Sequence, residues 1–207
     1  MAKQPTIKAI IFDLGGVLIQ VCQEERFRSL EVRWHRPPGQ LAELLWSSED
    51  NRLAEVGAIT DGEYWRRTAP GLGLYTLEAL RAFQQDLFGP AVVTQAMVDL
   101  VRRLHGPYRT GLLSNASDAL TPAFIAERFG LGGLFDVVLV SALVGVAKPD
   151  PAIYHLALDR LGTAPEATLF LDDQPPNVVA AAALGLQAIH FSGYEMLLAE
   201  LKQRGVV

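Results

Sequence analysis

The sequence contains very little cysteine, since Cys22 is the only one among 207 residues. An internal disulfide is therefore excluded, which fits a protein of a reducing compartment. Half of the residues are hydrophobic and a fifth are charged, so the chain has enough apolar material for a sizeable packed core. We interpret Cys22 itself as a small apolar residue in a buried position.

The sequence also lacks long basic runs and long hydrophobic runs. The formal net charge is -5, which argues against nucleic acid as a partner. An acidic protein repels phosphate esters at long range, so a phosphate site would need its own local positive charge. The apolar stretch near the N-terminus is too short to span a bilayer, and its surroundings are too charged for a signal peptide. The sequence therefore predicts a soluble, cytoplasmic protein without a membrane partner.

Five short apolar runs predict a parallel β-sheet. Each is apolar on both faces, which is typical of parallel strands that are covered by helices on two sides. The predicted strands are Ile7 to Phe12, Thr110 to Leu113, Phe135 to Val140, Thr168 to Leu171 and Gln187 to Phe191. The predicted helices between them are Thr94 to His105, Asp150 to Gly162 and Asn177 to Leu184. This repetition of strand and helix predicts an α/β fold with a doubly wound, Rossmann-like sheet.

The stretch from residue 22 to residue 90 departs from this pattern. It contains no convincing strand, only helical segments that are broken by turns. Thr60 with Glu63, for example, predicts a helix start through a capping box. We therefore predict an α/β core domain of residues 1–21 and 91–207, with residues 22–90 inserted as a small helical cap. Its place after the first strand puts this cap over the strand ends as a lid.

Polar residues follow the ends of four predicted strands. They are Asp13 with Gly15-Gly16, Ser114-Asn115, Lys148 and Asp172-Asp173. Because ligands of open α/β sheets bind at the carboxyl ends of the strands, we expect these residues to converge on one edge. A carboxylate, a hydroxyl, an ammonium and two further carboxylates suit phosphoryl transfer, which chiefly needs positioning and neutralisation of developing charge.

Asp13 is the predicted nucleophile. It ends an apolar strand, where an unpaired carboxylate is costly, and the glycines after it let the backbone come close to a bound group. We expect the carbonyl of Gly15 to help hold a cation beside Asp13, and Mg²⁺ prefers such hard oxygen ligands. Lys148 would supply the local positive charge that the overall charge of the protein does not.

Structural explanations compete with these roles. Taken alone, Ser114-Asn115 is an ordinary turn after a strand, Lys148 is a solvated loop lysine, and one member of the Asp172-Asp173 pair is the start of a helix. The presence of the other motifs in register favours the functional interpretation of all of them.

Further residues receive structural assignments. Asp150 is assigned to helix capping and Tyr154 to packing, while Asn177 is left open between a hydrogen bond to the site and a helix cap. Three residues of the predicted cap are tempting as specificity determinants but are assigned to its core: His35, Trp46 and Trp65.

Four segments in this order, FDLGGVL, LLSN, KPDPAIY and FLDDQPPN, resemble the motifs of the haloacid dehalogenase superfamily. The chain looks most like the branch with a helical cap inserted after the first motif and an Asp-Asp pair in the fourth. Within this branch it is similar to the phosphatase domain of soluble epoxide hydrolase and to the sugar-phosphate phosphatases. The resemblance covers the whole chain and implies a Mg²⁺-dependent hydrolase of a small phosphate ester.

The resemblance also implies roles for individual residues. Asp13 would form an aspartyl-phosphate intermediate, and Lys148 would assist it. The residues implied at the phosphate are Ser114, Asn115 and Lys148. The metal-binding set, with the Gly15 carbonyl included, is Asp13, Gly15, Asp172 and Asp173.

One position departs from the family pattern. Phosphatases of this family usually carry a second Asp two residues after the nucleophile, as general acid and base, and this chain has Gly15 there. General acid–base groups contribute about 10²–10⁴-fold to rate, so the covalent step would be slowed without being abolished. The dehalogenases of the family have a tyrosine at this position, use no metal and lack the carboxylate pair, so Gly15 does not match them either.

Three functions follow as hypotheses. The first is a Mg²⁺-dependent phosphatase that acts through Asp13 with weakened general acid catalysis. The second is a dehalogenase in which Asp13 displaces halide from a 2-haloacid. The third is a catalytically weak protein that keeps the site for phosphate binding or regulation. The physiological substrate and the oligomeric state do not follow from the sequence.

Overall fold

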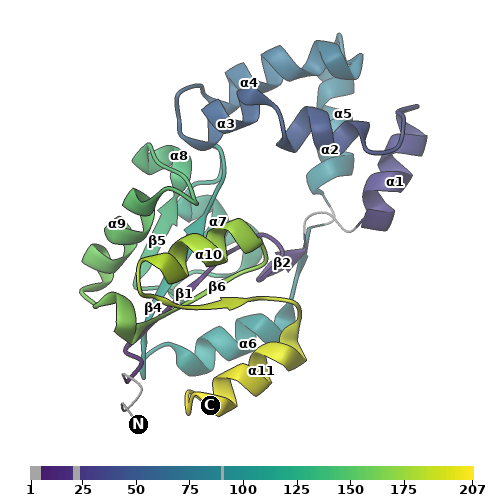
Figure 1. Cartoon of the computed structure of the whole chain (residues 1–207). Helices are drawn as coiled ribbons and strands as arrows, with labels where there is room; N and C mark the ends of the chain where they lie inside the picture. The colour runs from purple at the N-terminus through teal and green to yellow at the C-terminus, as the bar shows by residue number, and fades with distance from the viewer. Residues whose placement is uncertain (1–5, 21–23, 90) are drawn as a thin grey trace.

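The computed structural model describes residues 6–20, 24–89 and 91–207, with the side chains of residues 24–26 left aside. The predicted burial of Cys22 lies outside the described residues. Within them, the chain forms a parallel sheet with helices on both faces and a separate group of helices at one end of this sheet (Figure 1).

The central sheet has five parallel strands in the order β5-β4-β1-β6-β7. The strands are β1 Ala9–Phe12, β4 Arg109–Ser114, β5 Val137–Val140, β6 Thr168–Asp172 and β7 Gln187–His190. All five predicted strands are thus confirmed, with ends shifted by one or two residues. Ser114 and Asp172 are the last residues of their strands rather than the first residues of the loops after them. This fixes both side chains more rigidly than a loop would.

The two faces of the sheet bury different residues because side chains alternate along a strand. In β1, Ile10 and Phe12 face one side, and Ala9 and Ile11 face the other. The first side packs against α6 Gln95–Leu104, α7 Pro122–Phe129 and α11 Tyr194–Gln203. The second side packs against α9 Pro151–Leu161 and α10 Pro175–Ala183 (Figure 1). Helices on both faces bury β1 and β6 completely and β4 except for Arg109, which is why these strands are mostly apolar.

Two helix starts that the sequence predicts are capped in the structure by the expected side chains. Asp150 accepts a hydrogen bond from the Ala152 backbone N–H and so caps α9, which ends at Gly162 in the left-handed conformation. Thr60 accepts a bond from the Glu63 N–H, as the capping box predicts. The carboxylate of Glu63 instead receives bonds from Arg66 and Arg67.

A second group of helices lies at the carboxyl end of the sheet, at the top of Figure 1. Its members are α1 Glu24–Arg33, α2 Gln40–Trp46, α3 Glu49–Glu55, α4 Asp61–Thr68, the 3-10 turn η1 Ala69–Leu72 and α5 Leu77–Phe88. Within residues 24–89 there are helices and no β-strand, as the sequence predicts. This group has its own hydrophobic cluster, in which Leu41, Leu45, Phe83 and Leu87 are buried. The limits at residues 22 and 90 fall on undescribed positions and stay predictions.

A small antiparallel sheet that the sequence does not predict joins the two parts. β2 Ile19–Gln20 pairs with β3 Val92–Val93. The two chain segments that connect sheet and cap therefore run side by side. Strands of two residues carry no periodic signal, so pattern analysis cannot detect them.

The cap aromatics are placed differently from one another. Trp65 is buried and its ring contacts those of Tyr64, Phe83 and Phe88, as expected for a core residue. Trp46 lies at the edge of the same cluster and is 40% exposed. His35 is exposed in a turn with a positive φ of 53°, so its assignment to the core is wrong. Polar residues often form the turn after a helix end, and the exposed ring of His35 is not packed in the cap core.

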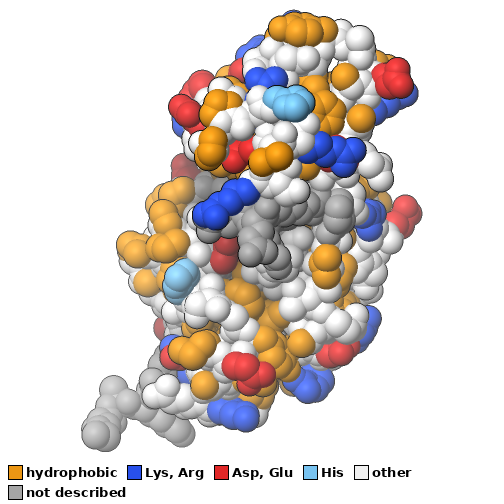
Figure 2. All heavy atoms as spheres, turned by 90° about the vertical axis from the view of Figure 1, so that its right-hand side faces the viewer, with side chains coloured by type: hydrophobic (Ala, Val, Ile, Leu, Met, Phe, Trp, Pro, Cys, Tyr) orange, Lys and Arg blue, Asp and Glu red, His pale blue; other side chains and the backbone are white. Residues whose placement is uncertain are grey.

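The molecular surface is mixed in charge. Among the described side chains on the face shown in Figure 2, lysine and arginine lie between acidic and apolar groups and do not gather in one basic patch. Across residues 6–20, 24–89 and 91–207, no helix is long and apolar enough to cross a bilayer.

Candidate functional site

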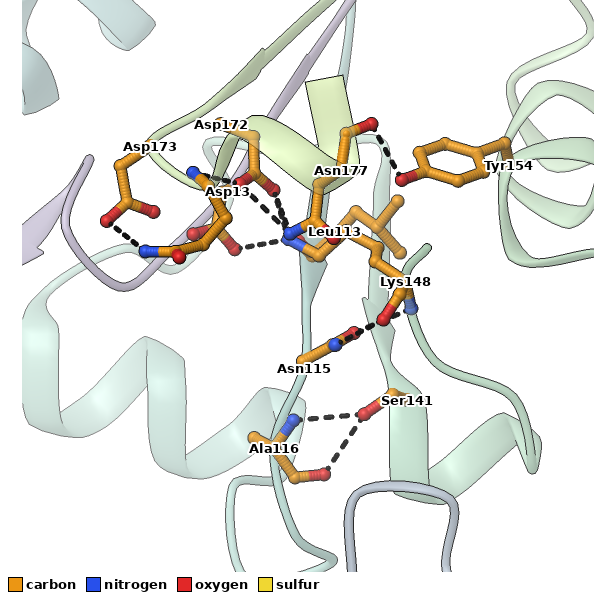
Figure 3. Close-up of polar contacts among 11 residues, drawn as sticks. Asp13, Leu113, Asn115, Ala116, Ser141, Lys148, Tyr154, Asp172, Asp173 and Asn177 are labelled. Carbon is orange, nitrogen blue, oxygen red and sulfur yellow. Dashed lines mark hydrogen bonds and ion pairs between the residues drawn. The ribbon is translucent and has the colours of Figure 1, made fainter. Parts of the chain in front are cut away.

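Three of the predicted site residues meet through direct ion pairs at the carboxyl rim of the sheet (Figure 3). The Lys148 Nζ lies 2.7 Å from the Asp13 Oδ1 and 2.6 Å from the Asp172 Oδ2. It also donates to the carbonyl of Leu113 at 3.0 Å. Asp13 follows β1, Leu113 belongs to β4 and Asp172 ends β6, so neighbouring strands bring these groups together. The predicted convergence is confirmed for this trio.

The Lys148 ammonium is buried but fully engaged. Its side chain is 2% exposed, and its three donors reach the three oxygens just described. Burial alone would lower the pKa of Lys148, but the carboxylates of Asp13 and Asp172 outweigh it and raise this pKa. Lys148 therefore stays charged, and it is no solvated loop lysine.

Asp13 is held in an unfavourable environment for a carboxylate. It is 7% exposed, and burial, followed by the repulsion of Asp172, raises its pKa to about 6 against the opposing attraction of Lys148. One ammonium shared between two carboxylates does not neutralise both. The site thus holds more negative charge than its own residues compensate.

Asp172 is fixed by neighbours on the α10 side. The Asn177 Nδ2 donates to its two carboxylate oxygens at 3.0 and 3.1 Å, and the Gln174 N–H donates to its Oδ1 at 2.8 Å. The alternative left open for Asn177 is therefore decided in favour of a hydrogen bond to the site. Behind it, the Tyr154 hydroxyl donates to the Asn177 carbonyl at 2.9 Å, and the Tyr154 ring packs on Phe170. Tyr154 is a packing residue, as predicted, with an added role in positioning α10.

The position of the Asp173 carboxylate depends on residue 16 being glycine. The φ of Gly16 is +73°, and a Cβ there would lie 2.4 Å from the Asp173 Oδ2. Only glycine therefore lets the turn after β1 pass beside this carboxylate. By contrast, a Cβ at Gly15 would meet nothing within 4 Å. Burial raises the pKa of Asp173, while the Gln174 side chain lowers it through a hydrogen bond.

The three carboxylates are suited to a divalent cation. Asp13, Asp172 and Asp173 each offer an oxygen, and these oxygens lie within 4.8 Å of one another. If all three are ionised, the single charge of Lys148 leaves a net charge of -2. A hard ion such as Mg²⁺ matches both this charge and the oxygen donors. The contribution of the Gly15 carbonyl to such a site stays a prediction.

Asn115 turns towards the backbone that carries Lys148. Its Nδ2 donates to the Lys148 carbonyl at 2.8 Å, and its Oδ1 accepts from the Lys148 N–H at 2.9 Å. This pair of bonds fixes the lysine loop against the end of β4. Ser114, one residue earlier, is buried at the strand end and lies in register with Val140. Direct contact of Ser114 or Asn115 with phosphate stays a prediction.

One supporting residue was missed by the sequence reasoning. The buried Ser141 hydroxyl accepts from the Ala116 N–H at 3.0 Å and donates to the Ala116 carbonyl at 3.2 Å. It ties α8 Ser141–Val144 to the loop after β4. A serine after an apolar strand carries no signal that distinguishes it from an ordinary turn residue.

The fold and the site together place the chain among the capped α/β hydrolases. A comparison with family models makes this specific, since the model of the haloacid dehalogenase-like hydrolases matches residues 7–185. The chain belongs to this family. The resemblance stated from the four motifs is thereby confirmed.

Individual relatives agree with this assignment. The chain is 41% identical over 203 residues to a phosphoserine phosphatase from Thermus thermophilus, covering 89% of this chain and 81% of that protein. It is 39% identical over 218 residues to bifunctional epoxide hydrolase 2 from Sus scrofa, covering 95% of this chain but 38% of that protein. Among solved structures, a predicted HAD-like family hydrolase from Porphyromonas gingivalis superimposes with a TM-score of 0.74 at 27% identity, covering 96% of this chain and 98% of that one.

Proposed function

We propose that the protein is a Mg²⁺-dependent phosphatase of a small phosphate ester, with Asp13 as the nucleophile. The observation that carries this proposal is the gathering of three carboxylates around one buried lysine, which leaves a charge that a divalent cation would balance. The 41% identity to a phosphatase over most of both chains supports it.

The residues of the chain have distinct tasks in this mechanism. The Asp13 carboxylate attacks phosphorus and forms the aspartyl-phosphate, and the Lys148 ammonium keeps this carboxylate oriented and balances charge on the phosphoryl oxygens. The metal set is Asp13, Asp172 and Asp173, with the Gly15 carbonyl; the Mg²⁺ bound there would neutralise the charge of the phosphoryl group. Asn177 and Gln174 hold Asp172 in place for this purpose.

The loop after β4 prepares the phosphate side of the site. We assign the Ser114 hydroxyl to a phosphoryl oxygen, because Ser114 ends the strand next to β1 and Asp13. Asn115 holds Lys148 through the two backbone bonds described above, and its position beside the phosphate follows from this placement. Lys148 thus supplies positive charge next to the phosphate, which the acidic protein as a whole does not.

The test is the replacement of Asp13 by Asn. The Asp13→Asn variant keeps the size of the side chain but lacks the nucleophilic oxygen charge, so turnover of an aryl phosphate with Mg²⁺ should fall to the background rate. A circular dichroism spectrum that matches wild type serves as the check that the variant is folded. Turnover that survives in Asp13→Asn would rule out the covalent mechanism.

A second candidate function is metal-dependent phosphate binding with weak turnover, and Gly15 is the observation that favours it. A screen of phosphorylated metabolites separates the two. Slow hydrolysis of every compound together with tight binding of one of them would indicate the binding function.

A further inference from the structure

The site as described lacks a group that protonates the leaving oxygen. The position where the family carries its acid is Gly15, and the space next to it is open. An alkoxide that leaves without a proton is a poor leaving group, so another acid would be of direct use. The cap lies at the end of the sheet that carries the site, so its residues are the first place to search for such a group (Figure 1).

The corner between α3 and α4 of the cap is bonded to the core. The Asp61 N–H donates to the Asp118 Oδ1 at 2.8 Å, and the Ser117 hydroxyl donates to the Asp61 Oδ1 at 2.8 Å. The Asp118 carboxylate thereby supplies a negative charge at the N-terminus of α4. Both core partners lie in the loop that follows Ser114, so this cap corner and the phosphate loop are fixed to each other.

The same corner approaches the core closely at a second point. A Cβ at Gly57 would lie 2.3 Å from the Ala142 carbonyl of α8, and the φ of Gly57 is +67°. Only glycine allows such contact between the two backbones. Since α8 directly precedes the loop with Lys148, the corner is seated between the two loops that form the phosphate side of the site.

Glu55 is the last residue of α3, two residues before this contact. It is half-buried, and the Asn51 Nδ2 donates to its Oε1 at 3.2 Å. Burial raises its pKa, against the Asn51 bond and the attraction of the Lys148 ammonium. Glu55 thus lies at the cap corner that approaches α8, and its carboxyl is near enough to the core for the Lys148 ammonium to lower its pKa.

We propose that Glu55 is the general acid of this enzyme and replaces the carboxyl that Gly15 cannot provide. This inference rests on the proposed phosphatase function. The docked corner, the glycine contact at α8 and the place of Glu55 two residues before that contact carry it.

The proton balance of the step is complete. As an Asp13 oxygen bonds to phosphorus, the bond between phosphorus and the ester oxygen breaks, and its electron pair leaves with that oxygen. The carboxylic acid of Glu55 gives its proton to this oxygen, so an alcohol departs and Glu55 becomes a carboxylate. That carboxylate then accepts a proton from the water whose oxygen bonds to phosphorus. The bond between phosphorus and the Asp13 oxygen breaks, its electron pair returns to the Asp13 carboxylate, and inorganic phosphate is released.

The experiment compares two substrates in the presence of Mg²⁺. 4-Nitrophenyl phosphate releases a stable phenolate that needs no proton, whereas glycerol phosphate releases an alkoxide that does. The value of kcat/KM reports the steps up to cleavage of the ester bond. The Glu55→Gln variant should lose about 10²–10⁴-fold in kcat/KM for glycerol phosphate but less than about tenfold for 4-nitrophenyl phosphate. A fall of equal size for both substrates, or no fall for either, would overturn the proposal.

A rescue variant and a control sharpen the comparison. Because the space at Gly15 is open, the double variant Gly15→Asp/Glu55→Gln should show a higher ratio of kcat/KM for glycerol phosphate to kcat/KM for 4-nitrophenyl phosphate than Glu55→Gln does. Glu49→Gln removes an exposed acid from the same helix and should leave both values unchanged.

Failure of the phosphatase function is distinguishable from failure of the Glu55 role. If wild-type protein hydrolyses neither substrate, or Asp13→Asn matches wild type, the proposed function falls and the role of Glu55 falls with it. If wild type is active, Asp13→Asn is inactive and Glu55→Gln affects both substrates alike, only the role of Glu55 is refuted.

Discussion

The same substitution should destabilise the protein at one of the two adjacent glycines after Asp13 and have little effect at the other. Gly16 has a φ of +73°, where a residue with a Cβ costs about 1–2 kcal/mol. For a protein of about this length, each kcal/mol lowers Tm by about 2–4 °C. Gly16→Ala should therefore lower Tm by several degrees, whereas Gly15→Ala should stay within about 0.5 kcal/mol of wild type, because the space there is open.

The functional consequence comes from Asp173. A Cβ on residue 16 would lie 2.4 Å from the Asp173 Oδ2 and 2.5 Å from its Cγ, which is closer than nonbonded atoms approach, so this side chain must rotate away. Displacement of groups that hold or orient a metal costs about 10–100-fold in affinity. We expect a loss of this order in Mg²⁺ affinity for Gly16→Ala and little change for Gly15→Ala.

Two measurements check this pair of variants. Denaturant unfolding in the absence of Mg²⁺ gives the free energy of unfolding, and titration calorimetry gives the Mg²⁺ affinity. Equal stabilities and equal affinities for the two variants would refute the claim that Gly16, rather than Gly15, shapes the turn beside Asp173.

Further predictions concern the buried charges. Lys148→Met leaves the Asp13 and Asp172 carboxylates without their cation, which should cost about 3–5 kcal/mol in the free energy of unfolding at neutral pH. Burial already raises the pKa of Asp13, and loss of the Lys148 charge would raise it further above its unfolded value, so the defect should shrink as pH falls, as denaturant unfolding at pH 5 and pH 8 would show. Tyr154→Phe removes one hydrogen bond to the Asn177 carbonyl and should cost about 1 kcal/mol, measurable by the same method. Mg²⁺ at about 100 times its Kd should stabilise wild type by about 2.7 kcal/mol, and Asp173→Asn should lose most of this gain in a thermal shift assay.

The sheet was readable from the sequence because its strands are buried on both faces. Covered on two sides by helices, each strand must be apolar throughout, and the polar residue at its end then stands out. Asp13 and Asp172 are detectable for this reason. The two-residue strands β2 and β3 leave no such trace, and their pairing depends on where the rest of the fold brings the chain.

The hydrogen-bond partners of polar side chains were harder to predict from the sequence than the strands. The place of Asn115 beside a phosphate stays a prediction, and the two bonds from its carboxamide to the backbone of Lys148 had no signal in the sequence. His35 was assigned to the cap core and is exposed. Sequence spacing places such residues in a loop or on a helix, but it does not determine which neighbour their polar atoms reach.

The sequence by itself determined the parallel sheet, the inserted helices and the acids and lysine at the strand ends. The strands and helices follow from the hydrophobic pattern. The acids and the lysine follow from short motifs and from their order along the chain. Only the tertiary structure decided that Asn177 holds Asp172, that Gly16 rather than Gly15 is sterically required, and that the corner of the cap is docked on the loop after β4 and on α8. Each of these depends on contacts between segments far apart in the sequence, whose distances are set by the packing of the whole fold.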